Sequence, residues 1–304
     1  MSWENPAIFS NVYLRLGGMH LLMSYVGCIG SLMAESGIVQ VLESTFAGVL
    51  KMLSGKKYPD NVRALRLLTE ELLQPVFTTH SSLTSMDGLM KILGDISKES
   101  RTAKLWVTCL INPVFTVMKY VRAEREGDWS LHLATVREMV PLFFAAGHFN
   151  YARYGLYYLR TMEKLPQEVA YHFLKGEHVI HLKRGIFNGI WSDMAIETTY
   201  MRYGKGKSGI VRLTLKPETI KTWAHSLTAC NKVIISLDSM RSQTSHTQSS
   251  EKHKEESKSR IALDSKDRTS LHEKLETCMN PFDESMHPQD LVNIVSSKVV
   301  WRHC

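Results

Sequence analysis

The sequence predicts a mainly α-helical protein, with a multi-helix globular body over residues 1–240 and a mostly disordered polar tail over residues 241–304. Through much of the body, apolar residues recur at three- and four-residue steps, which is the spacing of an amphipathic helix. Glycine and proline stand where these periodic stretches begin or end. Residues 241–273 contain almost no apolar side chains, too few to offset the entropy of folding, so we expect them to be disordered, and residues 274–304 contain a weak apolar element at 291–301.

The first part of the body divides into several helical stretches. One stripe of apolar residues, Val62, Leu65, Leu68, Leu72 and Val76, illustrates the pattern. Pro113 falls inside a long apolar stretch and should kink the helix there. Glycines near residues 27 and 30 should let a second element approach the first helix closely. The helices expected in this part span 19–34, 39–53, 60–76, 86–96, 101–125 and 128–146.

An aromatic-rich stretch follows, with five aromatic residues between Phe149 and Tyr158 beside Arg153 and Arg160. Aromatic rings next to arginines can stack on bases and hold phosphates. The helical spacing, however, favours a stripe that faces the core, with the tyrosine hydroxyls at its edge. The members of that stripe are Phe149, Ala152, Leu156, Leu159 and Met162. Pro166 should open a further short helix.

The remainder of the body contains the few strands that we expect. Short extended runs are predicted around 8–16, 177–183 and 209–215, and a helix over 192–203. A last helix runs from Pro217 to about Met240, and its apolar residues between 220 and 237 follow alternating steps of three and four. That spacing is typical of a coiled-coil seam, so this helix packs on the body or pairs with a partner chain or a second copy.

The stretch from Leu16 to Ala34 has no charged residue other than His20, and it is nearly long enough to cross a membrane. Its four glycines, two serines and histidine favour a buried helix, with a signal segment or membrane span as the alternative. The five cysteines are scattered without a C-x-x-C pair, which favours a reducing compartment. We therefore expect an intracellular protein, in the nucleus or cytoplasm, with no membrane partner.

Positive charge is concentrated in the body. The formal net charge is +7, whereas residues 241–304 hold ten basic and ten acidic residues. Residues 176–225 carry eight basic against four acidic residues around a glycine-lysine loop at 204–209. A surface of this sign favours an acidic partner such as nucleic acid, although ordinary surface charge is the alternative. The residues predicted to contact phosphates are Lys183, Arg184, Arg202, Lys205, Lys207, Arg212 and Lys216.

Three residues are candidates for catalysis. Asp193 and Glu197 lie four residues apart, on one face of the predicted helix. His20 lies inside the first apolar helix. The alternatives are a solvent-facing carboxylate pair and a hydrogen-bonded core histidine. No metal-ligand spacing is evident, since His178 and His181 should face opposite sides of an extended run, so we expect neither a metal site nor a cofactor.

Three stretches carry a resemblance to a known group: 15–30 (RLGGMHLLMSYVGCIG), 143–154 (FFAAGHFNYARY), and Ile196-Glu-Thr-Thr together with Gly206-Lys-Ser-Gly-Ile-Val. They resemble a group of long animal proteins that recur in genomes like products of mobile elements. The resemblance covers about residues 12–240. It implies that the chain derives from a mobile element.

A weaker resemblance is to transposases of the P-element and hAT kind, whose ribonuclease-H-like fold is interrupted by a helical insertion. It implies that His20 is a turn histidine, that 20–175 is the insertion, and that Glu197 is a late metal-binding acid. Two Mg²⁺ or Mn²⁺ ions would then activate water at a phosphodiester. The turn Gly17-Gly18-Met19-His20 offers no acid, however, and the strand with the first aspartate would precede residue 1.

Three functions follow from these patterns. The favoured one is a non-catalytic, mobile-element-derived helical domain that binds nucleic acid through one exposed basic surface. The second is a helical protein-interaction scaffold that uses the seam at 220–237. The third is a metal-dependent nuclease or transposase fragment, which the incomplete set of acids disfavours.

Overall fold

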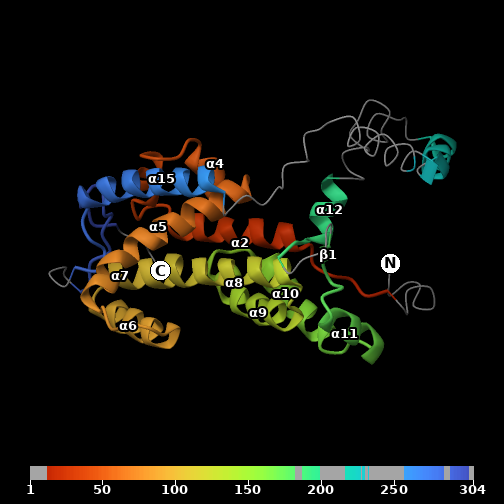
Figure 1. The fold of residues 1–304 in the computed structure, drawn as a ribbon, viewed down its shortest axis with the longest axis horizontal. Helices are drawn as coiled ribbons and strands as arrows, with labels where there is room; N and C mark the ends of the chain where they lie inside the picture. Colours follow the sequence, from red (N-terminus) through yellow and green to blue (C-terminus); the bar gives the residue numbers. More distant parts are fainter. Residues whose placement is uncertain are drawn as a thin grey trace. The chain divides into compact units, whose positions relative to one another are not determined.

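The computed structural model describes residues 12–181, 187–198, 216–226, 228–229, 232, 257–283 and 288–300. Its contacts divide the chain into two compact units. Unit 1 contains Met1–Asp193 and Asp264–Cys304, and unit 2 contains Met194–Leu263. The position of the predicted boundary, residue 240, lies outside the described residues. The prediction of a mainly α-helical protein is confirmed, because helices form most of the described chain (Figure 1).

Helix α2 (Gly18–Leu32) runs through the middle of unit 1 (Figure 1). It packs against α4 (Val49–Leu53), α5 (Tyr58–Thr79), α8 (Asn112–Glu126) and α9 (Trp129–Ala145). A Cβ at Gly30 would lie 2.1 Å from the Leu53 carbonyl oxygen, so the close approach predicted for this glycine is present. Leu22, Val26 and Ile29 are wholly buried. The stretch 16–34 is therefore a buried core helix, as predicted.

None of the helices among the described residues combines the length and the apolar character that crossing a bilayer requires.

The predicted helix over 39–53 forms two short helices instead, α3 (Ile38–Glu43) and α4. The Ser44 hydroxyl donates to the Val41 carbonyl at 2.7 Å, a local bond that competes with helix continuation. Gly48, at φ 71°, then adopts the left-handed conformation before α4 begins. These two features interrupt the apolar periodicity that predicted one helix.

Pro113 is accommodated by a change of helix type. Helix α7 (Arg101–Trp106) continues into a π-helical turn, η1 (Val107–Ile111), and then into α8, with Pro113 in its first turn. Proline has no N–H to donate to an upstream carbonyl, and a π turn absorbs an extra residue where the regular ladder is interrupted. This proline is therefore accommodated by a π turn just before it, and the predicted kink stays a prediction.

Helices α8, α9 and α10 (Phe149–Met162) follow one another as packed neighbours, and α11 (Gln167–Leu174) contacts α9. A second apolar cluster joins α5, η1 and α6 (Met86–Glu99). Its buried members are Leu73, Val76, Leu89, Leu93, Val107 and Ile111. These two groups of contacts make unit 1 a continuous helical body.

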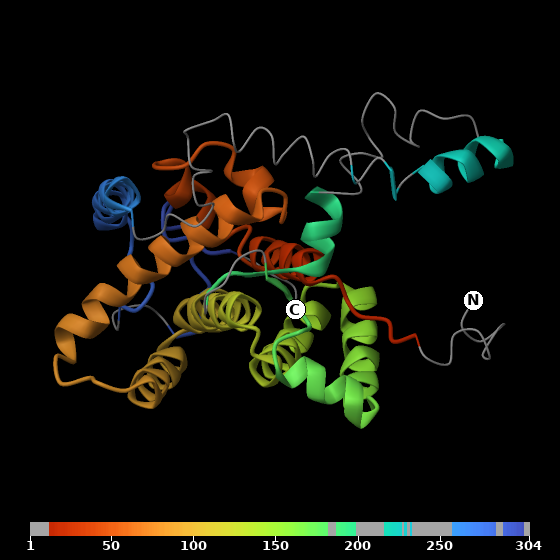
Figure 2. The same cartoon turned by 45° about the vertical axis from the view of Figure 1, so that its right-hand side comes forward.

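Part of the stretch expected to be disordered is a helix, which corrects that prediction for residues 258–273. Helix α15 (Lys258–Glu276) buries one apolar side chain, Leu271, and its residues from Asp264 onward lie alongside α5 (Figures 1 and 2). Charge pairs hold it there. Asp264 accepts from Arg63 at 2.7 Å and from Arg66 at 2.5 Å, and Arg268 donates to Glu71 at 2.5 Å.

The weak apolar element predicted near the C-terminus docks on the helical body over residues 291–300. Ile294 is wholly buried, and its N–H donates to the Ser36 carbonyl at 3.1 Å. The N–H of Val292 donates to the Thr102 hydroxyl at the start of α7, at 2.9 Å. Thus the C-terminal segment from Asp264 onward belongs to unit 1 together with residues 1–193.

Among the described residues, the named strands are two short ones. Strand β1 (Ile180–His181) pairs antiparallel with β2 (Gly189–Ile190), with Ile180 opposite Ile190. β1 lies within the extended run predicted at 177–183. β2 lies outside the predicted extended runs. Residues 12–16 are not a strand, contrary to the prediction, and 209–215 lie outside the described residues.

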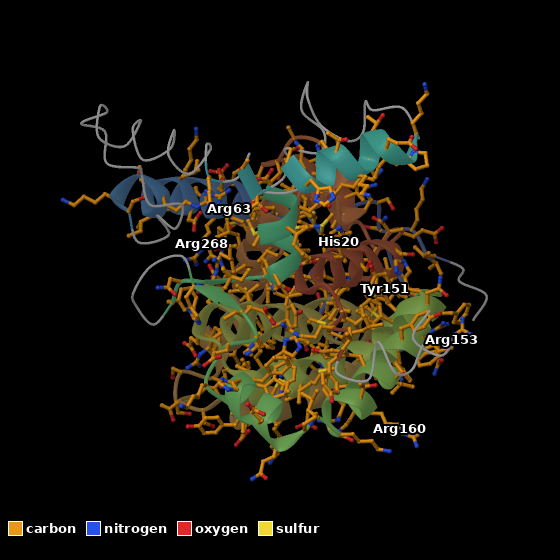
Figure 3. All side chains as sticks on the ribbon, turned by 90° about the vertical axis from the view of Figure 1, so that its right-hand side faces the viewer. His20, Arg63, Tyr151, Arg153, Arg160 and Arg268 are labelled. Carbon is orange, nitrogen blue, oxygen red and sulfur yellow. The ribbon has the colours of Figure 1, made fainter. Side chains whose placement is uncertain are left out.

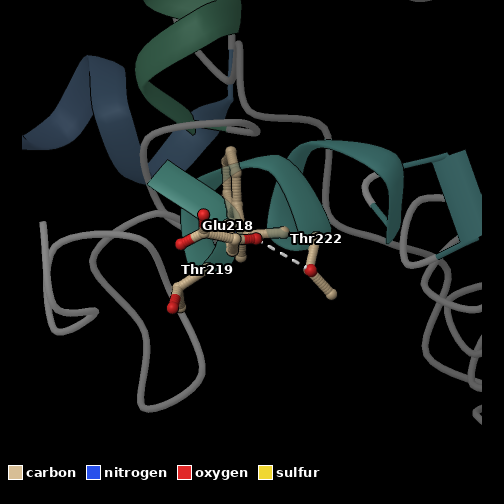
Figure 4. A pocket seen from close by; sticks show the side chains of 4 residues that line it. Glu218, Thr219 and Thr222 are labelled. Carbon is tan, nitrogen blue, oxygen red and sulfur yellow. Dashed lines mark hydrogen bonds between the residues drawn. The ribbon is translucent and has the colours of Figure 1, made fainter. Parts of the chain in front are cut away.

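In unit 2, residues 217–226 are helical, as predicted, and α12 (Ser192–Thr198) crosses the boundary of the two units. Much of the predicted 220–237 seam, including Leu227, Cys230, Ile234 and Leu237, lies outside the described residues. Glu218, Thr219, Thr222 and Trp223 line a hollow (Figure 4). The Thr222 hydroxyl donates to the Glu218 carbonyl at 2.9 Å. The hollow is therefore lined by neighbouring turns of a single helical segment.

Candidate functional site

The predicted phosphate-contacting residues lie largely outside the described chain. Lys216 is described, and it is exposed. The other six, Lys183, Arg184, Arg202, Lys205, Lys207 and Arg212, are not among the described residues. The prediction that they share one positively charged surface therefore stays a prediction.

Two of the three candidate catalytic residues, His20 and Asp193, meet at the start of α2. The Asp193 carboxylate accepts from the backbone N–H groups of Met19 and His20 at 3.1 and 3.0 Å, and it lies 2.9 Å from His20 Nδ1. The N-cap residue of α2 is Gly17, which has no side chain that could accept these hydrogen bonds. A carboxylate here satisfies free N–H groups and complements the helix dipole. Asp193 is thus a distant cap for α2.

Glu197 lies in unit 2, on α12, and is half-buried. The residue that joins His20 in unit 1 is Asp193, four positions earlier on the same helix. The arrangement in which His20 and Glu197 act on one substrate stays a prediction from resemblance.

The outer face of α10 combines aromatic rings with arginines. Four large side chains are more than half exposed: Phe149 at 63%, Tyr154 at 56%, Leu156 at 51% and Tyr157 at 67%. Arg153 and Arg160 are exposed between and beyond them. Figure 3 shows both arginines at the outer edge of unit 1, away from Arg63 and Arg268 beside α15. We call Phe149, Arg153, Tyr154, Leu156, Tyr157 and Arg160 the α10 face.

This exposure corrects the core stripe predicted for α10. Ala152, Leu159 and Met162 are buried as predicted, but Phe149 and Leu156 face outward. Gly155 and Tyr158 take the buried positions instead. Gly155 lies against Val140 of α9, where a Cβ would come within 3.3 Å of a methyl group. The face of α10 that packs on α9 is therefore turned around the helix axis relative to the face that apolar spacing predicts.

The α10 face is positively charged. Helix α10 has two arginines and no acidic residue. The guanidinium of Arg153 lies 5.7 Å from the ring centre of Tyr154, in a cation–π contact. Glu163, which follows the helix, is paired with Arg137 at 3.0 Å. The nearest carboxylate in sequence is therefore already neutralised.

A second polar group of interest is buried under α8, α9 and α10. Glu124 closes α8, His132 lies in α9, and His178 precedes β1; they are 2%, 1% and 2% exposed. Gly127 (φ 73°) ends α8 in the left-handed conformation and lies against Gly176 (φ 87°). A Cβ at Gly127 would come 3.0 Å from the Gly176 Cα, so this approach requires glycine. The close backbone contact brings His178 beside His132.

Hydrogen bonds fix the two imidazoles. His132 Nδ1 lies 2.5 Å from Glu124 Oε1, and His132 Nε2 lies 2.9 Å from the Tyr158 hydroxyl. Trp129 stacks on His132 with ring centres 4.9 Å apart. His178 Nδ1 donates to the Phe173 carbonyl at 3.3 Å. His178 Nε2 is buried and has no hydrogen-bond partner among the described residues.

Burial shifts the pKa values of His178 and Tyr158. Desolvation lowers the pKa of His178 to about 4, so its imidazole is neutral at pH 7. Desolvation also raises the pKa of Tyr158 to about 12, although nearby Arg15 opposes that change. The group therefore contains a neutral imidazole, and none of the described residues donates a hydrogen bond to the lone pair on its Nε2.

Comparison with protein families finds a match over nearly the whole chain. The chain belongs to the family described as Domain of unknown function (DUF8702). The family matches residues 1–87 and 79–303, which together cover nearly the whole chain. No curated protein and no solved structure matches it.

Sequence reasoning missed the buried histidine group in this DUF8702 member. Glu124 and His132 belong to different helices, and His178 lies 46 positions further on, so no short spacing links them. The available signal was the pair of glycines at 127 and 176, each next to a helix end, where close backbone contacts are expected. The two glycines predict that another backbone segment comes close to each of them, but they do not predict which segment it is.

Proposed function

We propose that this protein is a non-catalytic helical domain that binds single-stranded nucleic acid, with the α10 face as its base-stacking platform. The observation that supports this function is the exposure of three aromatic rings, two of them in line with two arginines, on a helix without carboxylates. Rings stack on any base, and guanidinium groups bind phosphates and also stack.

The order of residues along the helix suits an extended strand. Phe149, Arg153, Tyr157 and Arg160 follow one another at steps of four, four and three residues, so they form one stripe. At 1.5 Å of rise per residue, the stripe is about 16 Å long. Aromatic and cationic groups alternate along it, as required to contact bases and backbone in turn.

The basic residues of 183–216 extend the proposal. Lys183, Arg184, Arg202, Lys205, Lys207, Arg212 and Lys216 would add phosphate contacts that position the strand without reading its sequence. Derivation from a mobile element, whose products act on nucleic acid, agrees with this role and remains part of the proposal.

The competing function is a protein-interaction scaffold, because aromatic residues and arginine are also enriched at the centres of protein interfaces. The two functions differ in their dependence on salt. Binding to a nucleic acid releases counterions, so the affinity falls steeply and linearly with log salt. The charge on the α10 face favours the polyanion.

The test measures binding of a fluorescein-labelled single-stranded oligonucleotide to the full chain by anisotropy, across a series of salt concentrations. For single strands, each phosphate contact contributes about 0.7 to the slope of log affinity against log salt. The double variant Arg153→Gln/Arg160→Gln should lower that slope by about 1.4. Tyr154→Ala and Tyr157→Ala should each weaken binding by roughly 1–3 kcal/mol while leaving the slope unchanged.

Matched controls exist on other helices. Lys91→Gln/Lys104→Gln removes two exposed cations from α6 and α7, and Phe77→Ala removes a ring that is 42% exposed on α5. Both should bind like the wild type, and Tyr157→Phe should too, because stacking needs the ring. Absence of oligonucleotide binding at low salt, or controls as weak as the α10 variants, would overturn the proposal and favour a protein partner.

A further inference from the structure

We propose that Glu124, His132 and His178 form a buried site for a divalent metal ion, of which Zn²⁺ fits the ligands best. The three residues offer one carboxylate oxygen and two imidazole nitrogens that all lie within 4.8 Å of one another. Two histidines and a glutamate are a ligand set that Zn²⁺ accepts, with one tetrahedral position left for a water molecule. This site is independent of the α10 face.

The second observation behind the site is the orientation of His178. Its Nδ1–H donates to the Phe173 carbonyl, which places the unprotonated lone pair on Nε2. That nitrogen is buried without a hydrogen-bond partner among the described residues. Metal-binding histidines are typically held in this way, with the second nitrogen donating to a backbone carbonyl. A buried acceptor without a partner is costly unless something binds it.

His132 meets the same requirement through Tyr158. When Nδ1 binds the ion, Nε2 carries the proton and donates to the Tyr158 hydroxyl, 2.9 Å away. The ion then displaces the hydrogen bond between His132 Nδ1 and Glu124 Oε1: Nδ1 loses its proton to solvent and Nε2 takes one up, so the imidazole stays neutral and the number of bound protons is unchanged. The two ligand atoms, Nδ1 and Oε1, are 2.5 Å apart and must separate to roughly 3.3 Å, the spacing of two ligands about 2.0 Å from a tetrahedral ion.

The charges around the site act in opposite directions. Glu124 supplies the anion that favours a bound cation. Arg15 donates to the His178 carbonyl, and its charge lowers the pKa of that imidazole, so it also opposes a metal ion there. Zn²⁺ tolerates this balance better than Mg²⁺ or Ca²⁺ would, because it forms strong bonds to neutral imidazoles whereas those ions prefer oxygen ligands.

The location indicates a structural site. The three residues come from the end of α8, from α9 and from the turn before β1, and all are buried. An ion bound there would connect segments whose backbones meet at Gly127 and Gly176. Binding to the folded state alone would raise the melting temperature in a concentration-dependent manner.

The experiment titrates the chelator-treated full chain with Co²⁺ and follows its visible absorption, then displaces Co²⁺ with Zn²⁺. We expect one Co²⁺ per chain with a tetrahedral spectrum, displacement by one Zn²⁺, and a higher melting temperature with Zn²⁺. Glu124→Gln and His178→Gln keep the side-chain volume but lose a ligand. Each should weaken Co²⁺ binding by roughly 100-fold or more.

His172→Gln is the matched control, since His172 forms an exposed pair with Glu177 at 2.9 Å, six positions before His178. It should bind Co²⁺ as the wild type does. A wild-type chain without the Co²⁺ spectrum, ligand variants that bind normally, or a control that loses the ion would overturn the proposal. If the ligand variants do not fold, X-ray absorption of the Zn²⁺-loaded wild type decides. Two imidazoles with oxygen support the site, and sulfur or oxygen-only ligation overturns it.

Discussion

At the scale of single residues, polar side chains from distant parts of the chain set the arrangement of unit 1. Asp193 caps α2 from 174 positions away, and His178 reaches His132 across a contact of two glycines. The sequence singled out Asp193 and His20 for the chemistry of their side chains. It could not show that they pair, because the contact depends on how the segment after β2 lies against α2.

We predict that Asp193→Ala destabilises the protein by about 1–2 kcal/mol, because two N–H groups at the start of α2 lose their acceptor. Thermal or urea unfolding at pH 7 measures the change. Asp95→Ala is the control, since Asp95 forms an exposed pair with Lys98 whose loss should leave the stability nearly unchanged. Equal stability of the two variants would contradict the capping role.

At the scale of elements, apolar periodicity predicted helices well wherever burial decides the structure. α2, α5 and α9 were expected within a few residues of their observed ends. Apolar periodicity failed to predict α15. This helix docks on α5 through ion pairs, and its sequence therefore shows no apolar stripe. Apolar periodicity also misplaced the buried face of α10, since Gly155 and Tyr158 face α9 where the pattern favoured Leu156.

The ion pairs of α15 predict a dependence on pH. Burial alone would raise the pKa of Asp264, but hydrogen bonds from Arg63 and Arg66 outweigh it and hold the pKa below its usual value. The stability that Asp264 contributes through these bonds is therefore complete above its unfolded pKa of about 3.9, and it is lost as the pH falls through the lower folded value.

Hydrogen exchange of α15, corrected for the intrinsic rate, measures this effect. Protection should fall between pH 7 and about pH 2.5 more than that of α9, and Asp264→Asn should reduce it already at pH 7. The prediction is contradicted if the protection of α15 stays constant over this pH range, or if it is the same in Asp264→Asn as in the wild type. Contacts other than these charges would then hold the helix.

At the scale of the whole molecule, unit 1 combines a closed helical core with an exposed α10 face. The core contains the proposed metal site, and the face carries the proposed function, so each can be removed without touching the other. Composition predicted a positively charged protein, and apolar periodicity predicted a helical one. The residues that face solvent on α10 follow from the packing of α9 against Gly155, which no local pattern reveals.

Photo-crosslinking tests the proposed function most directly. The full chain is irradiated in complex with a single-stranded oligonucleotide that contains 5-iodouridine, and the crosslinked peptides are identified by mass spectrometry. Since stacked rings react preferentially, we predict crosslinks at Phe149, Tyr154 or Tyr157, which Tyr154→Ala/Tyr157→Ala should strongly reduce. Crosslinks confined to other segments, or a complex that forms without any at α10, would contradict the proposal.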